Sequence, residues 1–254
     1  MRTFYVQLLR ELRSIFYTPV AYVVIALFAG LMGFNFQSYI SILNKQPADV
    51  TVLEVVFLNA LFVFVFAFIA ALITMRSFAE EFRLGTVEML MTAPVKDWQV
   101  VLAKFFGASI FFAILLMPTA ACFWVFDIVS HGAAAAKSTG AIVSTYMLLL
   151  MLGMLFISIG VFASSLVRDQ INAAVITLVV TILYIFIPMV SARLLNVTDP
   201  RVKEVSEFFD PLTHIQDFSK GLVDTRRIVW YLTATSFFVI LTHHVFHSRK
   251  LKAS

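Results

Sequence analysis

Residues 76–98 read RSFAEEFRLGTVEMLMTAPVKDW, a charged segment with a helical pattern between two strongly apolar runs. Its large apolar side chains recur at i, i+4 and i+11 and therefore share one stripe of a helix: Phe78, Phe82 and Met89. A second stripe carries acidic groups and a glycine: Glu81, Gly85 and Glu88. The pattern predicts an amphipathic segment held at a membrane surface, which is a candidate docking element.

The same segment contains residues that break a helix. Gly85 weakens a helix, and Thr86 directly after it can cap a new turn. Glu88 then lies in the first turn, where the positive end of the helix dipole favours a carboxylate. Pro94 ends this second piece, and Asp97 can cap the helix that follows. We therefore expect a broken hairpin.

The composition excludes an ordinary soluble domain. Hydrophobic residues make up 61% of the 254 residues and charged residues only 13%, against about 25% charged residues in a typical soluble domain. The formal net charge of +4 is modest, and no basic run is dense enough to indicate nucleic-acid binding. The single cysteine, Cys122, lies in an apolar run and cannot form a disulfide within the chain.

Six apolar runs are long enough to cross a membrane as helices, since about 20 residues span the hydrocarbon layer. They cover about residues 20–43, 55–75, 101–126, 141–167, 171–190 and 228–246. Pro118 should bend the third span, and Gly153 and Gly160 should let another helix approach the fourth. The predicted fold class is an all-α integral membrane protein in which residues 1–254 form one transmembrane domain.

Two further segments flank the predicted spans. Residues 1–18 are basic and amphipathic, which predicts a helix that lies along the membrane. Residues 191–227 are polar but contain FFDPLTHIQDFSKGLVD. We expect one or two short helices there, broken at Pro211 and Gly221 and dipping into the membrane interface. Its apolar residues are expected to touch membrane: Phe208, Phe209, Leu212, Ile215 and Phe218.

The distribution of basic residues predicts the orientation. Six spans place both termini on one side, together with the hairpin. The short loops of the opposite side hold only Lys45 and Lys137, whereas the terminal side holds many more basic residues. Because basic residues are enriched in cytoplasmic segments, we expect cytoplasmic termini and a cytoplasmic hairpin. We expect the membrane to be a bacterial inner membrane.

The chain has no nucleotide-binding motif of its own. GAAAAKST around Lys137 is superficially like a phosphate loop, but His131 and Ala136 stand where glycines are required. If the protein uses ATP, then ATP and Mg²⁺ bind to a separate ATPase chain. We therefore predict no enzyme activity, no catalytic residue and no cofactor in this chain.

A haem or metal protein is one alternative. His243 and His247 lie four residues apart on one helical face, which is a permissible ligand spacing. No paired cysteine or carboxylate accompanies them in that segment. Histidines at the end of a span, before Arg249 and Lys250, are more often interfacial anchors, so we expect no metal site.

Polar residues inside the spans are few. No mid-membrane carboxylate pair is present, which argues against an ion-coupled carrier. Glu54 and Asp127 lie at predicted span ends, where solvation at the interface explains them. Asn35, Asn59 and Asn172 are candidates to line a cavity, although hydrogen bonding between helices is the more common role of such residues.

The hairpin residues resemble the integral-membrane subunit of ABC-2 type transporters. The resemblance is carried by Phe78-Ala79-Glu80-Glu81, then Gly85-Thr86-Val87-Glu88, Leu90 and Pro94. It extends over the whole chain, with an N-terminal elbow helix, six spans and a re-entrant outer segment at Asp210-Pro211-Leu212, Phe218, Gly221 and Asp224. The branch that contains the gliding-motility (GldF-like) permeases and the permease of nitrous-oxide-reductase maturation is the most similar.

The resemblance implies that residues 76–98 contain the coupling helix, which sits in a cleft of the ATPase subunit. On that basis Glu80, Glu81 and Glu88 pair with basic groups of the ATPase. Phe78 and Phe82 fill its groove, and Gly85 is the hinge. Thr86 and Pro94 complete the predicted coupling site.

The expected function is that of a permease subunit for export, working with a second copy or a paralogue, two ATPase subunits and membrane lipid. A scaffold that transmits mechanical work to an envelope or periplasmic partner, without transport, is the other alternative. The sequence leaves the cargo open.

Overall fold

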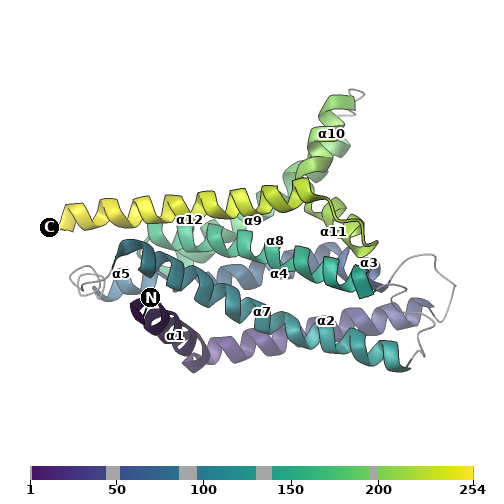
Figure 1. The fold of residues 1–254 in the computed structure, drawn as a ribbon, viewed down its shortest axis with the longest axis horizontal. Coiled ribbons are helices and arrows are strands. Elements are labelled where there is room, and N and C mark those ends of the chain that lie inside the picture. The colour runs from purple at the N-terminus through teal and green to yellow at the C-terminus, as the bar shows by residue number, and fades with distance from the viewer. Residues whose placement is uncertain (1, 44–51, 86–95, 130–138, 195–199, 254) are drawn as a thin grey trace.

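The computed structural model describes residues 2–43, 52–85, 96–129, 139–194 and 200–253. Within these ranges the chain is almost entirely helical and contains no strand. Long helices run side by side in an elongated bundle, and both termini lie at the same end as the short helix α5, Ala79–Leu84 (Figure 1). The predicted all-α fold is confirmed.

The N-terminal segment forms α1, Arg2–Tyr17, and the first span forms α2, Pro19–Leu43. Proline is tolerated in the first turn of a helix, where its missing N–H has no partner to lose, and Pro19 accordingly begins α2. Helix α1 packs against α7, Asp97–Val129. The rings of Phe16 and Phe111 meet there edge to face, with centroids 5.3 Å apart.

The second span differs from the prediction, because it is broken near Asn59. It consists of α3, Val52–Phe57, and α4, Ala60–Thr74. The Asn59 side chain accepts a hydrogen bond from the Leu61 N–H at 3.0 Å. Asparagine caps a helix in this way, so a residue that we expected inside a continuous span begins a new helix.

Helix α8, Thr139–Leu166, lies at the centre of the bundle and contacts α4, α7, α9, α11 and α12. The predicted close approach at its glycines is confirmed. A Cβ atom on Gly153 would lie 2.1 Å from the Phe112 ring, and one on Gly160 would lie 2.0 Å from the Thr74 hydroxyl. Real Cβ atoms do not approach so closely, so α7 and α4 pack on α8 only because these positions lack side chains.

The remaining helices are α9, Gln170–Leu194; α10, Pro200–Phe209; α11, Pro211–Ser219; and α12, Thr225–Ala253. The two short helices predicted for residues 191–227 are therefore present, and Figure 1 shows α10 standing out from the bundle. The expectation that Ile215 and Phe218 touch membrane is wrong, since both are fully buried within the chain. Helix α11 packs instead on α8 and α3.

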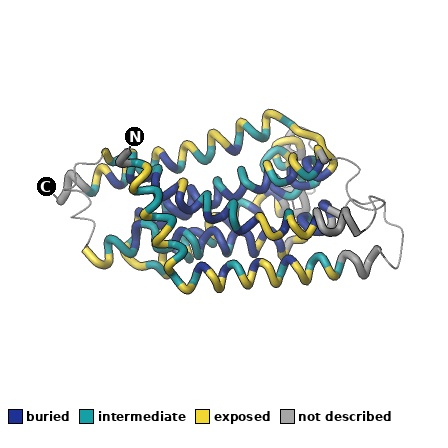
Figure 2. The backbone as a smooth tube through the Cα atoms, turned by 60° about the horizontal axis from the view of Figure 1, so that its bottom comes forward, coloured by how far each residue is buried: buried dark blue, intermediate teal, exposed yellow. Residues whose placement is uncertain are grey.

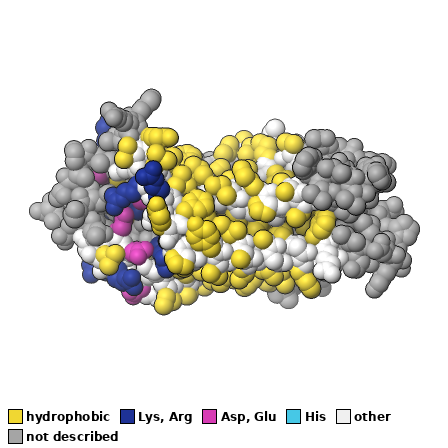
Figure 3. Space-filling model, turned by 90° about the horizontal axis from the view of Figure 1, so that it is seen from below, with side chains coloured by type: hydrophobic (Ala, Val, Ile, Leu, Met, Phe, Trp, Pro, Cys, Tyr) yellow, Lys and Arg dark blue, Asp and Glu magenta, His cyan; other side chains and the backbone are white. Residues whose placement is uncertain are grey.

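Six segments of the described chain are long and apolar enough to cross a membrane. They are Pro19–Ser38, Leu61–Leu84, Asp97–Phe123, Gly140–Leu166, Gln170–Pro188 and Thr225–Arg249. Buried residues lie in the middle of the bundle and exposed ones on its outer helices (Figure 2). Apolar side chains cover much of the length of the surface seen in Figure 3, and charged groups gather at one end. The prediction of six spans is confirmed.

Candidate functional site

The predicted coupling segment contains one described helix, α5, at the end of the bundle that carries the termini (Figure 1). Gly85 ends this helix with φ of 69° and ψ of 4°, in the left-handed region. Glycine adopts this conformation without the steric cost that other residues pay. Gly85 therefore does more than weaken a helix, because it turns the chain at the end of α5.

A side chain of α8 caps the start of α5. The backbone N–H groups of Phe78 and Ala79 both donate to Ser164 Oγ, each at 3.0 Å. The Ser164 hydroxyl in turn donates to the Met75 carbonyl at 3.4 Å. The first N–H groups of a helix have no partner within it, so Ser164 satisfies two of them from a different helix and fixes α5 to α8.

Two aromatic rings hold the apolar side of α5. Phe78 is fully buried, and its ring lies 5.5 Å from the Phe246 ring of α12. The Arg249 guanidinium lies 4.4 Å from the centroid of the Phe82 ring and also donates to the Leu166 carbonyl at 2.6 Å. The structure thus places Phe78 inside the chain instead of in an external groove, and it covers Phe82 with the last turns of α12.

A triplet of charged side chains joins α5 to α1 and α7. Lys104 of α7 has 4% of its surface exposed, and its Nζ lies 3.0 Å from Glu11 Oε1 of α1 and 2.8 Å from Glu81 Oε1. A buried charge must be paired, because it has lost its hydration. Glu81, which we expected to pair with an ATPase, therefore has an internal partner.

The outward surface of α5 is formed by its last residues. Arg83 is exposed, and 62% of the Leu84 surface is accessible. A leucine this exposed, next to a charged residue at the end of a well-anchored helix, is suited to contact another protein. Thr86, Glu88 and Pro94 of the predicted site lie outside the described residues, so their roles stay predictions.

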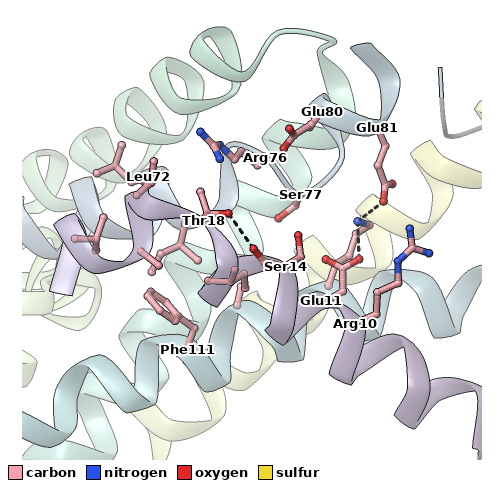
Figure 4. Close-up of a pocket in the computed structure, with 17 residues that line it drawn as sticks. Arg10, Glu11, Ser14, Thr18, Leu72, Arg76, Ser77, Glu80, Glu81 and Phe111 are labelled. Atoms are coloured by element: carbon pink, nitrogen blue, oxygen red, sulfur yellow. Dashed lines mark hydrogen bonds and ion pairs between the residues drawn. The ribbon is translucent and has the colours of Figure 1, made fainter. Parts of the chain in front are cut away.

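A cavity of about 230 Å³ lies between α5 and the N-terminal helices. Its polar side chains include Ser14 of α1, Arg76 and Ser77 in the turn after α4, Glu80 of α5 and Lys104 of α7. Figure 4 shows Arg76 and Glu80 on the same side of this cavity. Glu80 is half-buried and faces the cavity, so its position differs from that of Arg83.

The three candidate asparagines do not meet in one place. Asn59 Nδ2 donates to Asn35 Oδ1 at 3.2 Å, which joins α4 to α2. Asn172 lies in the first turn of α9, where its Nδ2 donates to Asp169 Oδ2 at 3.4 Å. Asn35 and Asn59 therefore bond between helices, and Asn172 bonds within its own turn.

The paired histidines of α12 contact the start of α7. His247 Nδ1 lies 3.0 Å from Asp97 Oδ2, and the His243 ring stacks on Trp98 with centroids 4.1 Å apart. The His243 and His247 rings are themselves stacked, at 6.1 Å. Among the described residues no group of three His, Cys, Asp or Glu side chains is placed to hold a metal ion.

A second polar cluster lies at the opposite end of the bundle, around α11. Glu54 is 9% exposed and accepts a hydrogen bond from Gln216 Nε2 at 2.9 Å. Its carboxylate also lies 3.7 Å from Lys220 Nζ. The expectation that Glu54 is simply solvated at a span end is therefore wrong, because it holds α11 against α3.

His214 is buried in the same cluster. Its Nδ1 lies 2.9 Å from the Tyr231 hydroxyl and its Nε2 lies 3.0 Å from the Phe208 carbonyl. Burial, assisted by the nearby Arg227 charge, lowers the pKa of His214 from 6.5 to about 4. The neutral ring therefore donates from Nε2 to the carbonyl and accepts from the tyrosine at Nδ1.

Sequence reasoning missed Ser164, Lys104 and Arg249 as parts of the site. Lys104 gives a signal, since it is the only charged residue between Asp97 and Asp127 in a long apolar run, and a cation in such a helix needs a carboxylate nearby. Ser164 gives no signal, because its neighbour Ser165 has the same side chain but donates to the Phe162 carbonyl of its own helix.

Comparison with known protein families gives one match. The model of a family described as ABC-2 family transporter protein matches residues 8–250, which is nearly the whole chain. A comparison with curated proteins finds no match.

Proposed function

The chain belongs to the ABC-2 family of transporter proteins, and from this premise we propose that a separate ATPase moves it by acting on α5. Membership makes the chain a multi-pass permease subunit of an ABC transporter. In this family the transmembrane subunit is normally not catalytic, and ATP hydrolysis takes place on a partner.

The observation that carries the proposal is the way in which α5 is attached. Ser164 fixes its start to α8, and Lys104 joins it to α7 and α1 through Glu81 and Glu11. Phe78 packs it against α12. A force on α5 is therefore transmitted to four other helices at once, since packed elements move as rigid units.

The docking surface in this proposal is the exposed end of α5. Arg83 and Leu84 would contact the ATPase, followed by the predicted residues Thr86, Glu88 and Pro94. Gly85 would serve as the hinge between the anchored and docked parts. Glu81 faces inward and pairs with Lys104, so we assign it to anchoring instead of docking. Glu80 faces the cavity and is not part of the docking surface.

The wider arrangement follows from the same proposal. Two permease chains, identical or paralogous, enclose the path for export, and each docks one ATPase. The termini and α5 lie in the cytoplasm, and the membrane is a bacterial inner membrane. We retain the gliding-motility and nitrous-oxide-reductase-maturation permeases as the branch to which we assign the chain.

A charge reversal at the docking surface tests the proposal. The tagged full-length chain would be purified from its native membrane with its ATPase and reconstituted into vesicles. We expect Arg83→Glu to reduce ATPase co-purification and ATP-driven transport at least tenfold. The matched control is Arg226→Glu, which reverses an exposed charge at the opposite end of the bundle. Equal loss with both variants, or no loss with Arg83→Glu, would contradict docking at α5.

A further inference from the structure

The cavity beside α5 contains polar groups that the proposed function does not use, among them Arg76 and Glu80. Its lining combines charged side chains with apolar ones such as Leu72 and Phe111 (Figure 4), and charged side chains gather at one end of the apolar surface in Figure 3. Its walls come from α1, α2, α4, α5 and α7. A cavity with both kinds of side chain in a membrane protein is at the depth of lipid headgroups.

The polar wall contains one buried donor that lacks an acceptor within the described residues. The Nε atom of Arg76 is buried and has no hydrogen-bond partner among the residues that the structure describes. The Ser14 and Ser77 side chains line the same space, below Arg76 in the view of Figure 4. A buried donor without an acceptor destabilises the folded chain, because it has given up its hydrogen bonds to water. A ligand with several acceptor oxygens, such as a phosphate group, would remove this destabilisation.

The charges of the lining decide which class of phosphate fits. Three basic and three acidic side chains line the cavity, so their formal charges cancel: Arg10, Arg76, Lys104, Glu11, Glu80 and Glu81. Lys104 is already paired with Glu11 and Glu81. Within the described chain, Arg10, Arg76 and Glu80 have no ion pair. Arg10 is exposed, whereas Arg76 and Glu80 are half-buried. Arg76 and Glu80 can take one anionic and one cationic group of the same ligand.

The rest of the lining is apolar. Val20 and Val24 of α2, Leu72 and Ile73 of α4, and Phe111 of α7 form this wall. The volume of about 230 Å³ is below the range of about 300–1,000 Å³ that is usual for pockets that enclose a whole ligand. The cavity is therefore suited to a headgroup whose chains leave it along α2, where Tyr22 and Val23 are more than half exposed.

We propose that this cavity binds the headgroup of a zwitterionic aminophospholipid from the adjoining leaflet. Arg76, with the Ser14 and Ser77 hydroxyls, holds the phosphate. The Glu80 carboxylate accepts hydrogen bonds from the primary ammonium, which a quaternary ammonium cannot donate. The acyl chains lie against α2. The lipid thus bridges α1 and α5 and fills a gap beside the triplet of charged side chains.

Native mass spectrometry of the purified full-length chain tests this proposal. The chain would be delipidated in detergent and titrated separately with phosphatidylethanolamine, phosphatidylcholine and phosphatidylglycerol. We expect one tightly bound phosphatidylethanolamine, with at least tenfold weaker binding of the other two lipids. Inorganic phosphate and glycerophosphoethanolamine, which lack acyl chains, should bind at least tenfold more weakly than the whole lipid.

Three variants assign the headgroup contacts. Arg76→Gln should weaken phosphatidylethanolamine binding at least tenfold, and Arg76→Lys should retain part of it. Glu80→Gln should reverse the preference toward phosphatidylglycerol, because the lining then carries one net positive charge. Arg13→Gln, an exposed residue of α1 outside the cavity, should bind like the unmodified chain. Equal binding of all three lipids, equal binding of inorganic phosphate, or an unchanged preference in Glu80→Gln would overturn the proposal.

Discussion

Lys104 Nζ lies 2.8 Å from Glu81 Oε1 and so joins α7 to α5 through a buried ion pair. The same ammonium group lies 3.0 Å from Glu11 Oε1 of α1 and 5.1 Å from the centroid of the Phe78 ring. One side chain therefore connects the N-terminal helix, the third span and the predicted coupling helix. Its partners are acidic residues on helices that are distant from it in sequence.

The first prediction concerns this triplet. Lys104→Met should lower the free energy of unfolding by about 3–5 kcal/mol, because two carboxylates then face each other without a cation. Denaturant unfolding in detergent would measure the loss. Adding Glu11→Gln and Glu81→Gln to the same chain should recover much of it.

The matched control is Lys220→Met at the other end of the bundle. Lys220 has 45% of its side chain exposed and lies 3.7 Å from Glu54, so its removal should cost less than about 1 kcal/mol. Similar losses of unfolding free energy for Lys104→Met and Lys220→Met would show that burial of the triplet does not increase its contribution to stability.

The second prediction concerns the cap of α5. Ser164→Ala should cost about 1–3 kcal/mol, because the N–H groups of Phe78 and Ala79 lose their acceptor. Hydrogen exchange of these two amides should accelerate. Ser165→Ala, which removes a bond within α8 alone, should leave both exchange rates unchanged. Acceleration in both variants would argue against a specific cap.

The third prediction concerns packing between the second and fourth spans. Gly160→Ala should destabilise the chain by about 1–3 kcal/mol, because the new methyl group would overlap Thr74 of α4. Gly140→Ala in the first turn of the same helix meets no atom within 4 Å and should be tolerated. Thermal unfolding of the two variants would compare them, and equal midpoints would contradict the close approach of α4 and α8.

The fourth prediction concerns pH. The pKa of buried His214 is lowered to about 4, so between pH 6.5 and 4 the unfolded chain binds a proton that the folded chain excludes. Stability should therefore fall as pH decreases through this window, by about 3 kcal/mol from this residue, and change little further below it. His214→Gln should remove this part of the pH dependence. A stability profile from pH 8 to 4 that is identical in both proteins would contradict the assignment.

Much of the fold was predictable because it depends on the lengths of the apolar runs in the sequence. Runs of about 20 apolar residues define spans without knowledge of their neighbours, and Gly153 and Gly160 marked the places where helices approach closely. The break predicted at Pro211 is likewise a local signal, and α10 ends at Phe209 while α11 begins at Pro211. The Asp210 side chain, which caps α11, was not predicted to do so.

The anchoring of α5 was not predictable in the same way. The Phe78 ring and the Glu81 carboxylate each satisfied the pattern of an exposed docking face, but their partners Phe246 and Lys104 lie on other helices. A single sequence does not show which other helix packs against the apolar or the acidic stripe of residues 76–98. The break at Asn59 was missed for a related reason, because an asparagine within an apolar run can either bond to another helix or cap a new one.

The most direct test of the central claim is a photo-crosslink between α5 and the ATPase. A photoreactive amino acid in place of Leu84 should crosslink to the ATPase in native membranes. The same amino acid in place of Leu222, which is 63% exposed in the turn between α11 and α12, should not. A crosslink from position 222, or none from position 84 while the ATPase still co-purifies, would contradict the account.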